Sequence, residues 1–390
     1  MKQTKQMSVF PPRKEGDLPN RLLISCSESD SNMYYATRFL APDSFVYLEV
    51  AGATFVLMSD LEVDRARVQA NVNKVLSYSQ YEGQAKKSGI ERPTFCDVLD
   101  LLLREQAVKQ LTVPTDFPLG QADALREKGY LLSIKKEPFF PERAIKRANE
   151  VAAIRKVQEA VESSMDEVVA LLQAASIQDG LIYSGGIPMT SESVRRLLHL
   201  RLMEKGCLAQ HTIVACGVDA CDPHNEGSGP LHAHQPIIFD IFPRSIESRY
   251  FADMSRTVVK GTASDGLKRL YDTVLEGQEL GIARVRNGAH GEAIHAEITN
   301  LFEARGYKTG VMQGRMQGFF HGTGHGVGLD IHEPPRISRA DWVLQAGEVV
   351  TVEPGLYYPE IGAVRIEDMV WVEEGGCQNL TTYPKVLEIP

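Results

Sequence analysis

The sequence lacks any long apolar run and any apolar segment at its start. Runs such as residues 236–239 are far shorter than the roughly 20 residues that a membrane-spanning helix needs. The first seven residues are mostly polar and do not form the apolar core of a signal peptide. We therefore expect neither a membrane segment nor a leader peptide.

Runs of basic residues are also lacking. The formal net charge is −9, and no long stretch of lysine and arginine occurs. Nucleic acids and anionic membranes bind proteins through clustered positive charge. Neither is therefore expected as a partner.

Cysteine is scarce, and its positions show no framework spacing. The six residues are Cys26, Cys96, Cys207, Cys216, Cys221 and Cys377. In a chain of this size we expect free thiols in a reducing compartment, and so a cytoplasmic protein. Cys216, Cys221 and His224 could form a zinc site, but no second cysteine pair follows them, so we disfavour it.

What is present is the composition of an ordinary globular protein. The chain has 390 residues, of which 43% are hydrophobic and 24% are charged. This length is sufficient for two domains, each with its own core. All ten histidines lie at or after His199, so chemistry that needs imidazole belongs to the C-terminal half.

After a polar N-terminal segment over residues 1–18, the N-terminal third alternates short strands with helices. Predicted strands cover residues 22–24, 45–50, 54–58, 111–113 and 130–134, and predicted helices cover 61–74, 96–106 and 121–128. This alternation predicts an α/β domain over residues 1–140. Two prolines within residues 137–141 indicate a hinge, so a second domain is expected over 141–390.

The second domain repeats one order of elements: two helices, then a hairpin. Predicted helices cover 151–172, 190–206, 267–285 and 291–305, and predicted strands cover 212–215, 235–242, 250–260, 348–353 and 363–372. Residues 176–189 are rich in glycine and serine, which predicts a loop. The order predicts an α+β domain with a pseudo-two-fold arrangement.

Each of the two hairpins carries a pair of acids among apolar residues. Asp240 lies inside the first strand of one hairpin, and Asp253 lies 13 residues later across a turn. Glu353 and Glu367 occupy corresponding places in the last hairpin. An acid in an apolar strand is costly to bury unless it is paired or binds a metal.

Between these acids, residues 320–333 contain three histidines, His321, His325 and His332, and four glycines. Four carboxylates in one cleft would repel one another unless a cation joined them. With His325 added, the donor set suits two divalent ions such as manganese, cobalt, zinc or iron(II). The alternatives are that a nearby arginine, Arg256 or Arg365, holds the acids, or that the glycines form a simple turn.

The same residues resemble the pita-bread metallopeptidases, which include aminopeptidase P, prolidase, methionine aminopeptidase and creatinase. The matching pieces occur in the family's order: His224, Asp240, residues 253–257, 321–332, 352–357 and 364–367. The N-terminal α/β domain resembles that of prolidase and aminopeptidase P, which methionine aminopeptidase lacks. The resemblance implies an α/β N-terminal domain followed by an α+β pita-bread catalytic domain with a pseudo-two-fold arrangement.

The resemblance also implies a role for each residue of the site. Metal ligands would be Asp240, Asp253, His325, Glu353 and Glu367. Glu353 would also act as general base, His332 and His224 would polarise the substrate carbonyl, and His321 and Arg365 would line the substrate pocket. Two departures, Phe242 in place of the usual glycine and a longer turn over residues 243–248, predict an altered cleft beside the first hairpin.

The implied activity is hydrolysis of Xaa–Pro peptide bonds by a metal-bridging hydroxide, as in aminopeptidase P or prolidase. We expect two metal ions per chain, manganese foremost with cobalt, zinc or iron as alternatives, short peptides with proline in second position as substrates, and a homodimer. The alternatives are a creatinase-like hydrolase of a non-peptide C–N bond and a catalytically silent binding module. The presence of all five metal ligands disfavours the first, and His224, His332 and Glu353 disfavour the second.

Overall fold

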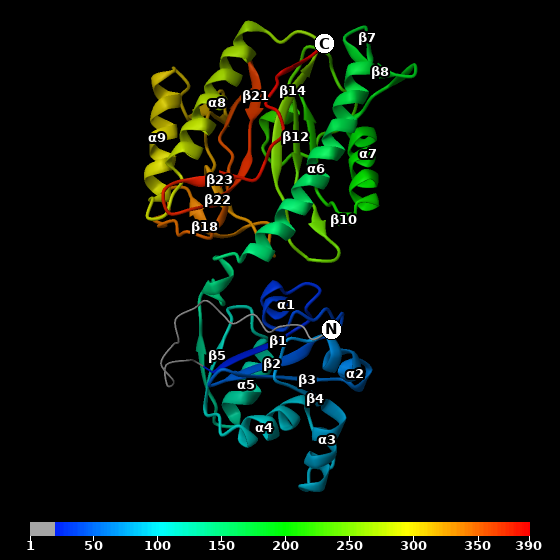
Figure 1. The fold of residues 1–390 in the computed structure, drawn as a ribbon, viewed down its shortest axis with the longest axis vertical. Coiled ribbons are helices and arrows are strands. Elements are labelled where there is room, and N and C mark those ends of the chain that lie inside the picture. The colour runs from blue at the N-terminus through cyan, green and yellow to red at the C-terminus, as the bar shows by residue number, and fades with distance from the viewer. Residues whose placement is uncertain (1–19) are drawn as a thin grey trace. The chain divides into compact units, whose positions relative to one another are not determined.

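A computed structural model describes residues 20–390, so the predictions for the N-terminal segment over residues 1–18 lie outside the described part. By its contacts the chain divides into two compact units, with the boundary between Pro141 and Glu142. No helix within the described residues is long and apolar enough to cross a membrane. Figure 1 shows both units.

The N-terminal unit is built on a six-stranded sheet in the order β4-β3-β2-β1-β5-β6. Its strands are β1 (Arg21–Ser25), β2 (Phe45–Val50), β3 (Ala53–Met58), β4 (Lys74–Ser77), β5 (Gln110–Val113) and β6 (Leu131–Ile134). Its helices are α1 (Ser31–Thr37), α2 (Asp60–Gln69), α3 (Tyr78–Lys87), α4 (Phe95–Glu105) and α5 (Leu119–Glu127). Neighbouring residues Leu22 and Leu23 belong to different apolar clusters, so each face of the sheet is covered by its own core.

One predicted helix in this unit is too long. The helix expected over residues 61–74 ends at Gln69, and β4 begins at Lys74. The Asn73 side chain accepts hydrogen bonds from the Thr54 backbone N–H at 2.7 Å and from its hydroxyl at 2.9 Å. These contacts draw residues 73–77 into the sheet beside β3, a long-range effect that helical spacing does not reveal.

The C-terminal unit contains two helix pairs and two main sheets (Figure 1). The helices are α6 (Ala148–Ala174), α7 (Ser191–Glu204), α8 (Asp265–Arg284) and α9 (Gly291–Ala304). The first sheet contains β11 (Ile213–Cys216), β12 (Ile237–Ile241), β14 (Met254–Lys260) and β24 (Glu388–Ile389). The second contains β18 (Glu333–Ile337), β17 (Gly324–Gly326), β19 (Val349–Val352), β22 (Asp368–Val372) and β23 (Cys377–Asn379).

Close packing fixes the helices of this unit. The predicted apolar stripe of α6, from Val151 to Leu172, is buried along its length. On α8, a Cβ atom at Gly277 would lie 2.6 Å from the ring of Phe302 in α9. Glycine is therefore required there for the two helices to approach.

Small strands complete the C-terminal unit. They are β7 (Ser176–Gln178), β8 (Leu181–Ser184), β9 (Ile187–Pro188), β10 (Cys207–Leu208), β13 (Arg244–Ser245), β15 (Gly310–Met312), β16 (Arg315–Gln317), β20 (Gly355–Tyr358) and β21 (Gly362–Arg365). The predicted loop over residues 176–189 is wrong, because β7, β8 and β9 form a meander there. Its first turn, Asp179-Gly180, has positive φ at both residues, as a two-residue hairpin turn requires.

Candidate metal and catalytic site

Two acids reach the site from the first sheet. Asp240 lies near the end of β12, opposite Ser255 of β14, and Asp253 immediately precedes β14. Asp253 is therefore two residues from the position opposite Asp240, on the same face of the sheet. The two acids converge as expected, although they are diagonal rather than directly opposed.

The second pair of acids lies where a ladder of hydrogen bonds breaks. The predicted pairing of 348–353 with 363–372 is interrupted, since β19 pairs with β22 while β20 and β21 form a separate pair. Glu353 and Glu367 face each other at this break. Pro354 has no backbone N–H to continue the ladder. The Glu353 N–H instead donates to the Thr323 carbonyl at 2.7 Å, and the Glu367 N–H donates to the Ser255 carbonyl at 3.1 Å.

His325, in β17, presents one ring nitrogen to these acids. Its Nδ1 lies 3.1 Å from the carbonyl oxygen of Gly326, so Nδ1 carries the proton and Nε2 carries a lone pair. Nε2 lies 3.4 Å from Glu353 Oε1 and 3.7 Å from Asp253 Oδ2. Burial lowers the pKa of His325 to about 3, so the ring is neutral at physiological pH.

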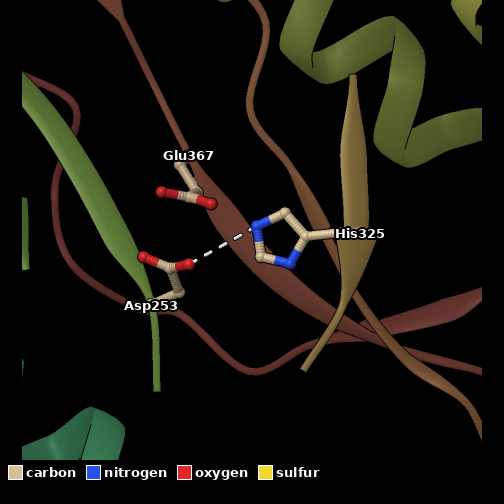
Figure 2. A group of neighbouring side chains, drawn as sticks. All are labelled: Asp253, His325 and Glu367. Carbon is tan, nitrogen blue, oxygen red and sulfur yellow. Dashed lines mark ion pairs between the residues drawn. The ribbon is translucent and has the colours of Figure 1, made fainter. Parts of the chain in front are cut away.

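The facing oxygen atoms have no proton donors of their own. Asp253, His325 and Glu367 offer one ligand atom each within 4.8 Å of one another, and their side chains point toward one point in Figure 2. Asp240 Oδ1, Asp253 Oδ1 and Glu367 Oε1 are buried without a hydrogen-bond partner among the described residues. An imidazole lone pair facing unpartnered carboxylate oxygens is what a divalent metal ion fits.

The electrostatics of the cluster agree with this. Burial, followed by the charges of Glu367 and Asp240, raises the pKa of Asp253 well above its usual value. Burial and then Glu353 act likewise on the pKa of Glu367. Burial also raises the pKa of Glu353 to about 8. Without a cation, these acids tend to hold protons near neutral pH.

The Arg365 guanidinium is hydrogen-bonded to residues of the chain around the acid cluster. Its guanidinium donates to Asp240 Oδ2 at 2.8 Å, to the Ser255 hydroxyl at 3.0 Å and to the Tyr357 hydroxyl at 3.0 Å. The Ser255 hydroxyl in turn donates to Glu367 Oε2 at 3.0 Å. Arg365 lines the cavity, and its hydrogen bonds orient the acids.

His321 is engaged in the same network. Its Nδ1 lies 2.7 Å from the Gly322 carbonyl oxygen, and its Nε2 lies 2.9 Å from the Tyr357 hydroxyl. Because Nδ1 donates to the carbonyl, Nε2 accepts the proton of Tyr357. His321 lines the cavity, but both of its nitrogens already have partners.

His224 and His332 lie on the open side of the site. Both are exposed and line a cavity of about 970 Å³ that also contains the five predicted ligands. The His332 ring meets the His325 ring edge-on, with centroids 4.4 Å apart. Phe242 and Arg336 also line this cavity. The arrangement therefore places two accessible imidazoles beside a buried acidic cluster.

The disfavoured zinc site is not assembled in the described part of the chain. Cys216 accepts a hydrogen bond from the His232 backbone N–H at 3.3 Å, and Cys221 is buried separately. Neither belongs to a group of residues able to share a metal ion.

Sequence reasoning missed three residues of the site, Ser255, Tyr357 and Arg336. Ser255 and Tyr357 lie inside matched motifs, two residues after Asp253 and four after Glu353, so the strand period placed Ser255 on the face of Asp253. Arg336 lies four residues after His332, and no local pattern marks it.

Comparison with known proteins identifies relatives of this chain. The model of metallopeptidase family M24 matches residues 152–374. An Xaa-Pro dipeptidase of Pyrococcus horikoshii is 28% identical over 310 residues, which cover 77% of this chain and 81% of that protein.

Two solved structures share the fold over both units. The structure titled Xaa-Pro dipeptidase from Bacillus anthracis has a TM-score of 0.79 at 23% identity and covers 95% of each chain. The X-Pro aminopeptidase of Thermotoga maritima has a TM-score of 0.78 at 23% identity, over 95% of this chain and 97% of that one. These likenesses confirm the predicted fold, an α/β N-terminal domain with a pita-bread catalytic domain.

Proposed function

The chain belongs to metallopeptidase family M24, and on that premise we propose that it is a metal-dependent exopeptidase that hydrolyses Xaa–Pro bonds in short peptides. The observation that carries the proposal is that His325 and the carboxylates of Asp253 and Glu367 are buried and lie close enough to share a metal ion. The relative named Xaa-Pro dipeptidase supports the choice of substrate.

The proposed metal ligands are the five predicted residues, Asp240, Asp253, His325, Glu353 and Glu367. Four carboxylates can bridge two cations, which supports two ions per chain. Oxygen-rich donors with one imidazole favour manganese, with cobalt, zinc or iron(II) as the alternatives. When bound, the metal lowers the pKa of water and so supplies a nucleophile at neutral pH.

The residues of the chain would then move protons and hold the reacting carbonyl. Glu353, beside His325, is the proposed acceptor of the proton lost by the attacking water, and it would deliver that proton to the proline nitrogen. His224 and His332 face the cavity and would donate hydrogen bonds to the carbonyl oxygen as negative charge develops on it. Arg365 would hold Asp240 in place.

Arg336 supports a dipeptide as the preferred substrate. Its side chain is half-buried in the cavity wall, and no acid among residues 20–390 forms an ion pair with it. A guanidinium that no acid holds in an ion pair suits a free carboxylate, which a dipeptide presents on its proline. A longer peptide would place an amide there instead.

A comparison of two peptides tests the proposal. The Mn(II)-loaded protein should cleave Ala-Pro and cleave Ala-Pro-Ala less well, and a chelator should abolish both activities until Mn(II) is restored. Arg336→Gln should raise the KM for Ala-Pro by about 10-fold, as expected for losing one charged contact. Arg339→Gln, an exposed arginine three residues away, is the control and should not change it.

Other outcomes would point to the alternatives. If the metal-loaded wild-type protein cleaves neither peptide, the proposed function is contradicted. The alternative of a catalytically silent binding module would then remain. Hydrolysis of creatine but not of Ala-Pro would indicate the creatinase-like reaction.

Three further proposals concern organisation and location. Separate domains over residues 1–140 and 141–390 are supported by the two prolines within residues 137–141 and by the family resemblance, a homodimer by the resemblance alone, and a cytoplasmic location by the scattered cysteines. A solution mass near that of one chain, 43.2 kDa, would contradict the dimer.

A further inference from the structure

A second group of charges, three of them buried and one, Asp330, half-exposed, lies close to His332 in the chain and takes no part in the proposed metal site. Lys146 Nζ lies 2.6 Å from Glu333 Oε1, and Arg143 Nη2 lies 2.9 Å from Glu333 Oε2. Arg143 Nη2 also lies 2.7 Å from Asp330 Oδ2. The side chains of Lys146, Glu333 and Arg143 are 1%, 6% and 9% exposed. We call these four residues the clamp.

The two cations of the clamp are held by backbone contacts of their own segment. The Lys146 N–H donates to the Gly347 carbonyl at 2.8 Å, and Ile145 forms a bridge with Glu348. Directly afterwards, the Arg147 N–H donates to Glu150 Oε2 at 2.9 Å, which caps the start of α6. The cations therefore project from a fixed segment rather than from a free loop.

The two anions of the clamp flank His332. Asp330 lies two residues before it and Glu333 one residue after it. The Glu333 carboxylate also packs on Gly328, where a Cβ atom would lie 2.4 Å from Oε1. Among the described residues no hydrogen bond holds the His332 ring, so its position depends on the backbone of residues 328–333.

Stability alone is a weak reason for such a cluster. The desolvation of buried ions offsets much of their attraction, and apolar residues of similar volume are often as stable. Contacts around a functional histidine instead fix its orientation. We propose that Arg143 and Lys146 are positioning residues that act through His332, a role that rests on the proposed function of that histidine.

Hydrogen exchange tests the clamp without reference to turnover. In the Mn(II)-loaded protein, Arg143→Gln and Lys146→Met should each speed amide exchange over residues 328–333 by about 10-fold or more, because local opening becomes easier. Lys260→Met is the matched control. Taken as whole residues, Lys146 and Lys260 are both 4% exposed, but Lys260 Nζ donates to the carbonyls of Gln173 and Pro390. This variant should leave exchange over 328–333 unchanged.

A double-mutant cycle tests whether the clamp acts through His332. Alone, Arg143→Gln and Lys146→Met should lower kcat for Ala-Pro by about 10- to 100-fold with little change in KM, the usual cost of losing an orienting partner. In a His332→Ala background the same substitutions should change kcat by less than about twofold, since residues acting through one group are not additive.

Two results would overturn the proposal. One is exchange over residues 328–333 that matches the Lys260→Met control, and the other is a full loss of kcat on top of His332→Ala. If the Mn(II)-loaded wild type cleaves no peptide, the proposed function fails, while the exchange measurement still decides whether the clamp orders this loop.

Discussion

Two neighbouring acids, Glu367 and Asp368, are both buried and have opposite surroundings. Asp368 is bonded to Arg256 Nη2 at 2.8 Å, to Asn379 Nδ2 at 2.9 Å and to Lys385 Nζ at 2.8 Å. Although burial acts against it, Arg256 and then Lys385 hold its pKa below the usual value. Glu367 faces other acids, and its pKa is raised by burial and then by Glu353.

The difference separates a structural charge from a functional one. Around Asp368 the chain supplies its own cations, so the acid links strands and needs nothing from outside. Around Glu367 the chain gathers acids, and no lysine or arginine among residues 20–390 is hydrogen-bonded to the side-chain carboxylate of Asp253, Glu353 or Glu367. A site arranged in this way requires a cation from solution.

The largest expected effect is on turnover, and it should appear when an acid of the metal site is replaced but not when Asp368 is replaced. Glu353→Gln should lower kcat for Ala-Pro by roughly 10²- to 10⁴-fold, the usual contribution of a general acid–base group. Asp368→Asn, in protein that remains folded at the assay temperature, should change kcat far less. Steady-state kinetics of both Mn(II)-loaded variants measure this, and equal losses would remove the distinction between the two acids.

The next effect is on stability, and it should appear when Asp368 is replaced but not when Glu367 is replaced. Asp368→Asn should lower the free energy of unfolding of the metal-free protein by about 3 kcal/mol, because it leaves the buried charge of Arg256 and the half-buried charge of Lys385 without their carboxylate partner. Glu367→Gln should be neutral or stabilising without metal, since it relieves repulsion. Urea unfolding in a chelator measures both values. A larger loss in Glu367→Gln would contradict the assignment.

A smaller effect should appear in the pH dependence of the metal-free protein. Glu353 has a folded-state pKa of about 8 against an ordinary value of 4.5, so between these values the folded state binds more protons than the unfolded state. The contribution of Glu353 to the free energy of unfolding should therefore fall as pH rises through this window, by at most about 1.4 kcal/mol per pH unit. Asp368 has the opposite sign, and its contribution is lost as pH falls below its usual value of 3.8.

Unfolding curves at pH 5 and pH 8 in a chelator would measure this slope. Glu353→Gln should flatten it, because glutamine does not titrate. An equal change in stability from pH 5 to pH 8 in Glu353→Gln and in the wild type would show that Glu353 is not held in its protonated form.

The acids and His325 could be found from sequence because each stands out against its neighbours. Asp240 interrupts an apolar strand, and such a residue needs a partner that local sequence does not provide. What could not be predicted depends on contacts distant in sequence. The Asn73 side chain bonds to Thr54 and so ends the helix expected over residues 61–74, and the Tyr357 hydroxyl is hydrogen-bonded to Nε2 of His321, a residue that we expected to line the substrate pocket.

The break between β19 and β20 also depends partly on local sequence and partly on a contact distant in sequence. Pro354 is visible in the sequence, but the carbonyl of Thr323 that receives the Glu353 N–H is 30 positions earlier in the chain. The lysine and arginine of the clamp are nearly 190 residues from Glu333, so no local pattern links them.

Calorimetric titration of the metal-free protein with Mn(II) measures directly whether the acids around His325 bind two metal ions. Two ions should bind per wild-type chain, Glu367→Gln should bind at least one fewer, and Asp368→Asn should bind as many as the wild type. Substantially less than one ion per wild-type chain, or equal binding by Glu367→Gln and the wild type, would contradict it.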